Sequence, residues 1–286
     1  MLSFDLPPSQ ATSEKLQCFS SCFQSFIDVV ENTEDDQEID FIDMTAGAGH
    51  YADVPEGTAI RAITLAEAYP KIKFNMTFFE SNKAHAAELA RRIEDEPPKK
   101  NIAYKIIKWR CEREIKRLIE EGIKRHTFIC IDPCKAAYPV FDEIVALINS
   151  APLRPLMSIL VTKQTSSIHR PLSQPTRFPG IPKKIFGNTR NVRSTYNKAK
   201  DKNMIQAMAK LWADKIKLAT SRSSMEILGP IPLGSDNRCY HALLVTNDRL
   251  NADLKLFTDV YAEWIYEEDV KAEREAELCE LSSTGK

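Results

Sequence analysis

The residues with the clearest chemical potential follow an apolar stretch near residue 41. This stretch ends in an acidic residue and a Gly-x-Gly turn, formed by Asp43, Gly47 and Gly49. The chain has only nine glycines, and two of them lie in this turn. Glycine accepts positive φ angles and carries no Cβ, so such a turn lets a bound ligand approach the backbone closely. The pattern therefore predicts a ligand-binding turn after a buried strand.

Two further acidic residues end apolar runs later in the chain. Glu80 follows the β-rich stretch Lys73–Phe79, and Asp132 follows the continuous apolar run Thr127–Ile131. The carboxyl ends of parallel strands meet at one edge of a sheet, where α/β proteins bind their ligands. A carboxylate at the second strand end can accept hydrogen bonds from both ribose hydroxyls of a nucleoside. These positions predict a nucleoside-containing ligand at that edge.

The elements that must position these residues alternate along the chain. The predicted strands span about 39–44, 73–79, 103–107, 127–131, 157–161, 225–228 and 240–246. The predicted helices span about 14–30, 58–69, 82–93, 113–123, 140–148, 203–218 and 254–278. Alternation of this kind favours a parallel sheet with helices on both faces. The last two strands flank a turn at 234–237 and are predicted to pair antiparallel.

The domain organisation follows from changes in composition. We expect an N-terminal arm and helix (1–37), a central domain (38–250) and an acidic C-terminal helix (251–286). The first helix carries an apolar stripe at helical spacing, made of Leu16, Phe19, Phe23, Phe26 and Ile27. Core packing is the favoured interpretation of this stripe, and a groove for a protein partner is the alternative.

The segment 163–200 differs from the rest of the chain because it has nine Lys or Arg residues and no Asp or Glu. It is too long for an ordinary connection, so we expect a functional loop or a mobile lid. Basic side chains can neutralise phosphates, while Phe178, Phe186 or Tyr196 could stack on bases. The expected substrate-binding residues are Lys163, Arg170, Arg177, Lys183, Lys184, Arg190 and Arg193. A solvated loop is the alternative, but its place after a strand end favours nucleic acid.

Composition excludes several classes of protein. The formal net charge is -1, with 43% hydrophobic and 28% charged residues, as in ordinary globular proteins. No apolar run approaches the roughly 20 residues that span a bilayer, and the N-terminus lacks the features of a signal peptide. The seven cysteines are odd in number and scattered, and no C-x-x-C pair or metal-binding histidine spacing occurs. We expect a cytoplasmic protein without membrane partner, disulfide framework or metal.

The segment Asp43–Tyr51 also carries a family resemblance. It reads DMTAGAGHY, which resembles the Asp-x-x-Ala-Gly-x-Gly-x-Tyr opening of the three-Cys-motif partner proteins and of the bacterial 23S ribosomal RNA adenine-N6 methyltransferases. The segment Gly57–Ala62 (GTAIRA) is similar to the small-residue segment that follows in the former. The resemblance covers roughly residues 38–165. It implies a Rossmann-like class I methyltransferase fold, with a mostly parallel seven-stranded sheet and an antiparallel last strand.

The same resemblance implies S-adenosylmethionine as the cofactor. In class I methyltransferases the acidic strand end and the glycine turn surround the methionine part, and the second acidic residue holds the ribose. NAD is less favoured, because Ala52 stands where a G-x-G-x-x-G motif has its third glycine. The expected cofactor-binding residues are Asp43, Thr45, Ala46, Gly47, Gly49, His50, Glu80 and Ser81.

A second motif begins at Asp132. Amino-methyltransferases carry Asp-Pro-Pro-Tyr at this strand end, where the Asp and a proline carbonyl accept hydrogen bonds from the target amino group and the ring stacks on a flipped base. Asp132 and Pro133 match this pattern, Cys134 replaces the second proline, and Tyr138 is the nearest aromatic residue. We expect methyl transfer to a base of DNA or RNA, with adenine N6 as the favoured atom.

Two alternatives remain for this motif. Pro133-Cys134 resembles the Pro-Cys of pyrimidine C5-methyltransferases, in which a thiolate adds to C6, and the neighbouring Lys135 can favour the thiolate. The other alternative is an inactive binding module of the same fold, which keeps the cofactor pocket and the basic segment. Fold does not fix substrate, so a protein or small-molecule acceptor is also compatible with the sequence.

Overall fold

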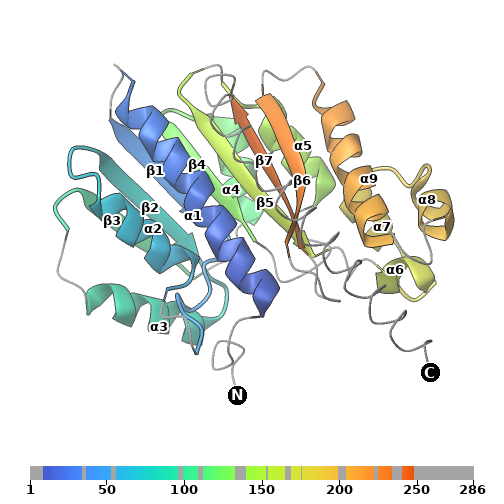
Figure 1. Ribbon diagram of the computed structural model, residues 1–286, viewed down its shortest axis with the longest axis horizontal. Coiled ribbons are helices and arrows are strands. Elements are labelled where there is room, and N and C mark those ends of the chain that lie inside the picture. The colour runs from blue at the N-terminus through green and yellow to red at the C-terminus, as the bar shows by residue number, and fades with distance from the viewer. Residues whose placement is uncertain are drawn as a thin grey trace, which may run out of the picture.

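A seven-stranded sheet forms the centre of the computed structural model (Figure 1). The structure describes residues 9–33, 37–52, 56–95, 99–108, 112–132, 140–152, 154–164, 169–174, 176–198, 204–221, 225–233 and 240–247. The strands are β1 (Glu38–Asp43), β2 (Lys73–Phe79), β3 (Ile102–Ile107), β4 (His126–Ile131), β5 (Met157–Gln164), β6 (Met225–Leu233) and β7 (Tyr240–Asn247). Their order across the sheet is β3-β2-β1-β4-β5-β7-β6.

The direction of the strands defines the fold. Neighbouring strands from β3 to β5 are parallel, whereas β7 pairs antiparallel with both β5 and β6. β7 therefore runs against the other strands of the sheet. This is the Rossmann-like class I methyltransferase fold, and the predicted sheet with an antiparallel last strand is confirmed. Strand β4 lies in the middle and is buried along its whole length, as its continuous apolar sequence requires.

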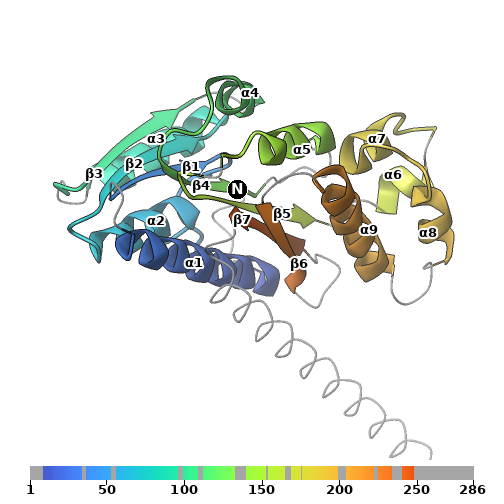
Figure 2. The ribbon, with the colours of Figure 1, turned by 90° about the horizontal axis from the view of Figure 1, so that it is seen from above.

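Helices cover both faces of the sheet. The longer helices are α1 (Gln10–Glu31), α2 (Thr58–Glu67), α3 (Lys83–Glu94), α4 (Glu112–Glu121), α5 (Phe141–Asn149) and α9 (Met204–Ala219). Buried residues of α1, α2 and α3 join one core cluster, and those of α4, α5 and α9 join the other. Figure 2 shows α1 and α2 on one side of the sheet and α4 and α5 on the opposite side.

The N-terminal helix packs against the middle of the sheet. It begins at an N-cap in which the side chain of Ser9 accepts a hydrogen bond from the backbone N–H of Thr12. The ring of Phe23 on α1 lies 4.8 Å from that of Phe41 on β1 and 5.1 Å from that of Phe128 on β4, measured between centroids. Core packing of the apolar stripe is therefore confirmed, and α1 shares the core of the sheet.

The segment 163–200, predicted to be a functional loop or a mobile lid, contains regular structure where it is described. Strand β5 continues to Gln164, and three short helices follow: α6 (His169–Ser173), α7 (Ile181–Phe186) and α8 (Val192–Lys198). They gather beside α9, at the end of the sheet away from β3 (Figure 1). Phe186 and Tyr196 are buried in the second core cluster, so neither ring is free to stack on a base. These buried aromatic residues are the physical reason why the segment folds.

The last two strands extend further than their sequence indicated. Strand β6 continues beyond Gly229-Pro230 to Leu233, because a shift in its register with β7 between Leu228 and Ile231 accommodates the interruption. The predicted antiparallel pairing of β6 with β7 is confirmed. The predicted C-terminal helix at 254–278 lies outside the described residues. Among the helices that the structure describes, none has the length and apolar character needed to cross a membrane.

Candidate functional site

Asp43, the last residue of β1, carries a buried carboxyl group. Its side chain is 1% exposed, and its Oδ1 accepts a hydrogen bond of 2.9 Å from the backbone N–H of Thr45. Its Oδ2 has no hydrogen-bond partner among the described residues. Burial raises the pKa of Asp43 to about 7; the Thr45 hydrogen bond opposes this rise, and the negative charges of Asp132 and Glu80 add to it. A group of this kind is poised to bind a hydrogen-bond donor or a cation.

The glycine turn after β1 is open on one side and packed on the other. Gly47 has a φ of 66°, and a Cβ at this position would meet nothing within 4 Å. Gly49 has a φ of 81°, and its Cβ would lie 2.8 Å from a side-chain carbon of Leu89. The open side at Gly47 leaves the backbone accessible to a ligand, whereas Gly49 is needed for packing.

The turn is closed by a third glycine, which the sequence reasoning did not assign to the site. The backbone N–H of Gly57 donates a hydrogen bond of 2.7 Å to the carbonyl oxygen of Gly49. A Cβ on Gly57 would lie 2.9 Å from the carbonyl carbon of Gly49. The small-residue segment GTAIRA contained this signal, since only glycine allows the two backbones to come so close.

Glu80 connects the end of β2 with the glycine turn. Its Oε2 accepts a hydrogen bond of 3.0 Å from the backbone N–H of Gly47, and its Oε1 accepts one of 2.6 Å from that of Asn82. The backbone N–H of Ala46 also donates to the carbonyl oxygen of Phe79 at 3.0 Å. Both carboxylate oxygens keep a second lone pair for a ligand. The structure thus brings Glu80 and the turn together, as the sequence predicted.

Asp132 stands at the end of β4 and is held by three other elements. Lys15 of α1 places its Nζ 2.6 Å from Asp132 Oδ2, and the hydroxyl of Thr162 on β5 donates to Oδ1. The backbone N–H of Asp132 donates to the side chain of Thr45 at 3.0 Å. Sequence reasoning missed Lys15 and Thr162. The available signal was that Lys15 lies one helical turn before Phe19 and so continues the apolar stripe of α1.

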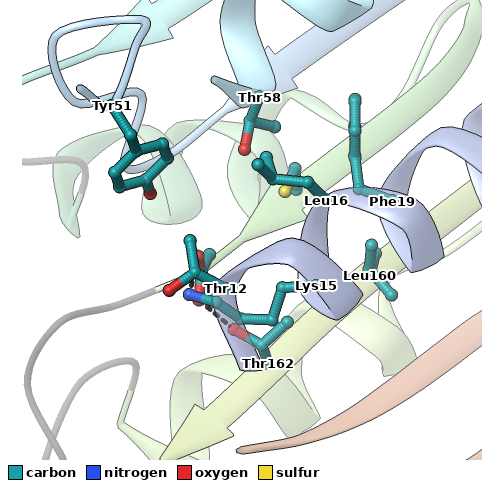
Figure 3. A pocket seen from close by; sticks show the side chains of 10 residues that line it. Thr12, Lys15, Leu16, Phe19, Tyr51, Thr58, Leu160 and Thr162 are labelled. Carbon is teal, nitrogen blue, oxygen red and sulfur yellow. Dashed lines mark hydrogen bonds and ion pairs between the residues drawn. The ribbon is translucent and has the colours of Figure 1, made fainter. Parts of the chain in front are cut away.

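A pocket lies beside Asp132, between α1, the glycine turn and the ends of β4 and β5. Figure 3 shows Lys15 and Thr162 close together, with Tyr51 and Thr58 across the pocket from them. The residues that line it are Thr12, Lys15, Leu16, Phe19, Tyr51, Thr58, Cys130, Asp132, Leu160 and Thr162. Its lining combines apolar side chains with polar ones, and the polar ones include Asp132 and Thr162 at the strand ends.

The remaining predicted residues lie in different parts of the chain. Pro133, Cys134 and Tyr138 lie outside the described residues. Ser81 is exposed beside Glu80, and the Nδ1 of His50 lies 3.4 Å from the carbonyl oxygen of Ala48. Five of the predicted basic residues are exposed on or next to α7 and α8, namely Arg177, Lys183, Lys184, Arg190 and Arg193. Arg170 lies in α6.

Lys163 was wrongly assigned to the basic surface. It belongs to β5 and is only 1% exposed, and burial lowers the pKa of its amine to about 7. The extra length of β5 is the physical reason for this correction, because pairing with β7 carries Lys163 into the sheet opposite His241. Its ammonium cannot contact a phosphate on the surface.

The cysteines on this side of the sheet are free thiols. Cys18 and Cys22 of α1 and Cys130 of β4 are all buried. A hydrogen bond with Cys18 and burial hold the pKa of the Cys22 thiol well above its ordinary range. Burial, together with the charges of Asp43 and Asp132, does the same for Cys130. These thiols are therefore packing residues with low reactivity.

Comparisons with known proteins find similarity in structure alone. No protein-family model and no curated protein matches the sequence. Trm1 from Pyrococcus horikoshii, solved with S-adenosyl-L-methionine, is 13% identical with a TM-score of 0.43; the match covers 87% of this chain and 60% of that one. The putative methyltransferase yhhF from Escherichia coli is 12% identical with a TM-score of 0.40, over 85% of this chain and 91% of that one. Likeness at this level assigns no activity.

Proposed function

We propose that this protein is an S-adenosylmethionine-dependent methyltransferase. The observation that carries the proposal is the meeting of Asp43, the Gly47 turn, Glu80 and Asp132 at the carboxyl edge of a class I methyltransferase sheet. Ligands of open α/β sheets bind at this edge. Bound S-adenosylmethionine would supply a methyl group activated by its sulfonium charge.

The residues present fit this cofactor. The uncovered backbone at Gly47 allows close approach, and the Glu80 oxygens keep lone pairs that can accept hydrogen bonds from ribose hydroxyls. The Oδ2 of Asp43, which has no hydrogen-bond partner among the described residues, can accept a hydrogen bond from the methionine part. The carboxyl groups of Asp43 and Glu80 favour a cationic ligand, whereas Lys15 balances the charge of Asp132.

We further propose that the methyl acceptor is an exocyclic amino group of a nucleic-acid base, with adenine N6 as the favoured atom. Asp132 presents a carboxylate fixed by Lys15 and Thr162, and such a group can orient an amino group toward the methyl donor. Orientation of this kind lowers the entropic part of the barrier. Roles for Pro133, Cys134 and Tyr138 remain predictions from the sequence.

The basic surface supports DNA or RNA as the partner. Exposed residues between Arg177 and Lys198 include six basic side chains and no acidic one. Such a surface can neutralise phosphates and so bind a polynucleotide independently of its sequence. The Arg177 guanidinium carbon lies 5.8 Å from the centroid of the Phe178 ring, which is half-buried and therefore partly accessible for stacking.

An inactive binding module of the same fold is the second candidate. The ion pair between Lys15 and Asp132 favours it, because in this structure the carboxylate that should orient the acceptor is already engaged by the chain itself. Methylation of pyrimidine C5 through Cys134 rests on the sequence motif alone.

The cofactor proposal is tested by titration calorimetry with S-adenosylmethionine. The unmodified protein should bind, and Glu80→Ala should weaken binding at least about tenfold because it loses the ribose acceptor. Asp214→Ala, an exposed carboxylate of α9 that pairs with Lys210, is the matched control and should bind normally. No binding by the unmodified protein would sink the cofactor proposal.

The acceptor is tested by mass spectrometry of nucleosides after incubation with labelled cofactor and DNA or RNA. We expect labelled N6-methyladenosine or its deoxy form, lost in Asp132→Ala. Loss in Cys134→Ser but not in Asp132→Ala would instead favour C5 chemistry. Cofactor binding without any labelled nucleoside would contradict the nucleic-acid acceptor and favour the inactive module.

A further inference from the structure

Lys15 brings a positive charge to a site that is otherwise built from strand ends. Its Nζ lies 2.6 Å from Asp132 Oδ2, and the side chains of Lys15 and Asp132 are only 11% and 22% exposed. Charges removed from water to this degree interact more strongly than those of surface ion pairs. Loss of one partner leaves the other partly buried and uncompensated.

The backbone that carries Lys15 is fixed in the core. Leu16, Cys18 and Phe19, which follow it directly, are all buried. Further along α1, the Ser20 hydroxyl accepts a hydrogen bond of 3.3 Å from the Arg61 guanidinium. Since α1 cannot leave the site without opening the core, Lys15 forms part of the pocket wall and is not a detachable plug.

Asp132 keeps room for an acceptor while Lys15 remains in place. A carboxylate offers about four lone-pair positions, and the side chains of Lys15 and Thr162 occupy one on each oxygen. An incoming N–H can therefore bind a remaining lone pair. The carboxylate is also restrained on both oxygens, so the direction of those lone pairs is fixed.

The charge balance of the Lys15–Asp132 pair favours a neutral amino group over a protonated amine. Lys15 compensates Asp132, so the pair carries no net charge and gives a protonated amine no net attraction. A protonated amine would in addition stand near the Lys15 ammonium and lack a nucleophilic lone pair. A neutral exocyclic amino group meets neither obstacle.

We propose that Lys15 is a positioning and specificity-determining residue of the acceptor site, which fixes Asp132 and makes the site select a neutral amino group over a protonated amine. The inference rests on the proposed methyltransferase function and deepens it. In the step concerned, the lone pair of the acceptor nitrogen forms a bond to the methyl carbon as the carbon–sulfur bond breaks, with its electron pair going to sulfur. The methylated nitrogen then loses one proton to water.

The test compares the steady-state kinetics of Lys15→Met, Lys15→Arg and the unmodified protein on single-stranded adenine-containing DNA and RNA. Lys15→Met should lower kcat about 100-fold with little change in the acceptor KM, because the aligned geometry and not ground-state binding is lost. Lys15→Arg should recover at least tenfold of that loss. Lys210→Met, which removes the lysine of an exposed ion pair on α9, should keep full activity.

A second measurement separates positioning from a merely structural role. The ratio of transfer to the oligonucleotide over transfer to spermidine, a polyamine protonated at neutral pH, should fall at least tenfold in Lys15→Met. An unchanged ratio, or a loss that Lys15→Arg does not rescue, would reduce Lys15 to a structural residue. A kcat of Lys15→Met equal to or higher than that of the unmodified protein would overturn this inference but leave the proposed function standing. Absence of transfer by the unmodified protein would overturn the proposed function and the inference with it.

Discussion

Asp132 and Lys163 lie on opposite faces of the sheet at the same edge, and the protein accommodates their charges in different ways. On the α1 face, Asp132 lies beside a pocket and its charge is balanced by Lys15. On the opposite face, Lys163 and His241 are cross-strand partners that are 1% and 3% exposed. Burial lowers the pKa of Lys163 to about 7 and that of His241 to about 4. The charge of Asp132 is compensated by an ion pair at a pocket, whereas burial disfavours the charges of Lys163 and His241 within the core.

Two consecutive residues of β5 point to these opposite faces. Thr162 and Lys163 are neighbours in β5, and successive side chains of a strand point to opposite faces. The hydroxyl of Thr162 donates a hydrogen bond to Asp132, whereas the side chain of Lys163 is buried on the opposite face of the sheet. Position at a strand end is therefore insufficient to assign a residue to a site, because the face on which it lies decides what it can contact.

Among the variants that test this comparison, Lys163→Met is expected to change the free energy of unfolding most. The difference between an ordinary pKa of 10.5 and one of about 7 corresponds to about 5 kcal/mol, an upper limit on what the variant gains. The folded state binds fewer protons than the unfolded state between these values, so the unmodified protein gains stability as pH rises through this window. Denaturant unfolding should find Lys163→Met more stable at pH 6, with the difference shrinking by pH 10.

A matched lysine on the surface provides the control for this experiment. Lys198 of α8 is exposed, so Lys198→Met should stay within about 0.5 kcal/mol of the unmodified protein at both pH values. An equal difference for Lys163→Met at pH 6 and pH 10 would show that its amine is not disfavoured in the core, and the contrast between the faces would disappear.

Asp43→Asn should give the opposite pH dependence and a slightly smaller effect. Its folded pKa of about 7 lies above the ordinary 3.8, so the unmodified protein loses up to about 4 kcal/mol of stability as pH rises through this window. The variant should therefore match the unmodified protein near pH 4 and exceed its stability at pH 9 in thermal or denaturant unfolding. The same variant should bind S-adenosylmethionine more weakly. A stability gain confined to acid pH would contradict this assignment.

The smallest effect, on oligonucleotide binding, is expected for the exposed basic residues on or next to α7 and α8. Arg190→Ala with Arg193→Ala should weaken oligonucleotide binding only a few-fold at low salt, because other basic residues remain. It should also reduce the slope of log Kd against log salt by about one for each phosphate that is no longer neutralised. Fluorescence anisotropy between 50 and 200 mM salt measures both. Lys105→Ala, on β3 at the opposite edge of the sheet, is the control; an equal effect there would remove the basic surface from binding.

The strand ends could be predicted from the sequence, and for a physical reason. Asp43, Glu80 and Asp132 each follow an apolar run, and parallel pairing brings such ends to one edge whatever the details of packing. The contacts of Asp132 could not be predicted in this way. Lys15 lies 117 residues from Asp132, and their contact depends on how α1 is rotated over the sheet.

The structure of the segment after β5 could not be predicted from the sequence, for two reasons. Helices of five to seven residues are too short to establish a 3.6-residue period, so α6, α7 and α8 left little pattern in the sequence. The end of β5 depends on pairing with β7, a strand about 80 residues later, and that pairing placed Lys163 inside. Composition alone does not distinguish the buried Lys163 from the exposed basic residues of this segment.

The position of α1 at the start of the chain has a consequence for the order of folding during synthesis. The ring of Phe23 can pack on Phe41 of β1 as soon as these first two elements have been made. Asp132 and Thr162 are synthesised much later, and contacts over such separations are slow to form. The nascent chain can therefore build the first part of its core well before the contacts of Asp132 exist. A ribosome-stalled chain that ends before β4 should protect α1 from proteolysis although it lacks Asp132 and Thr162.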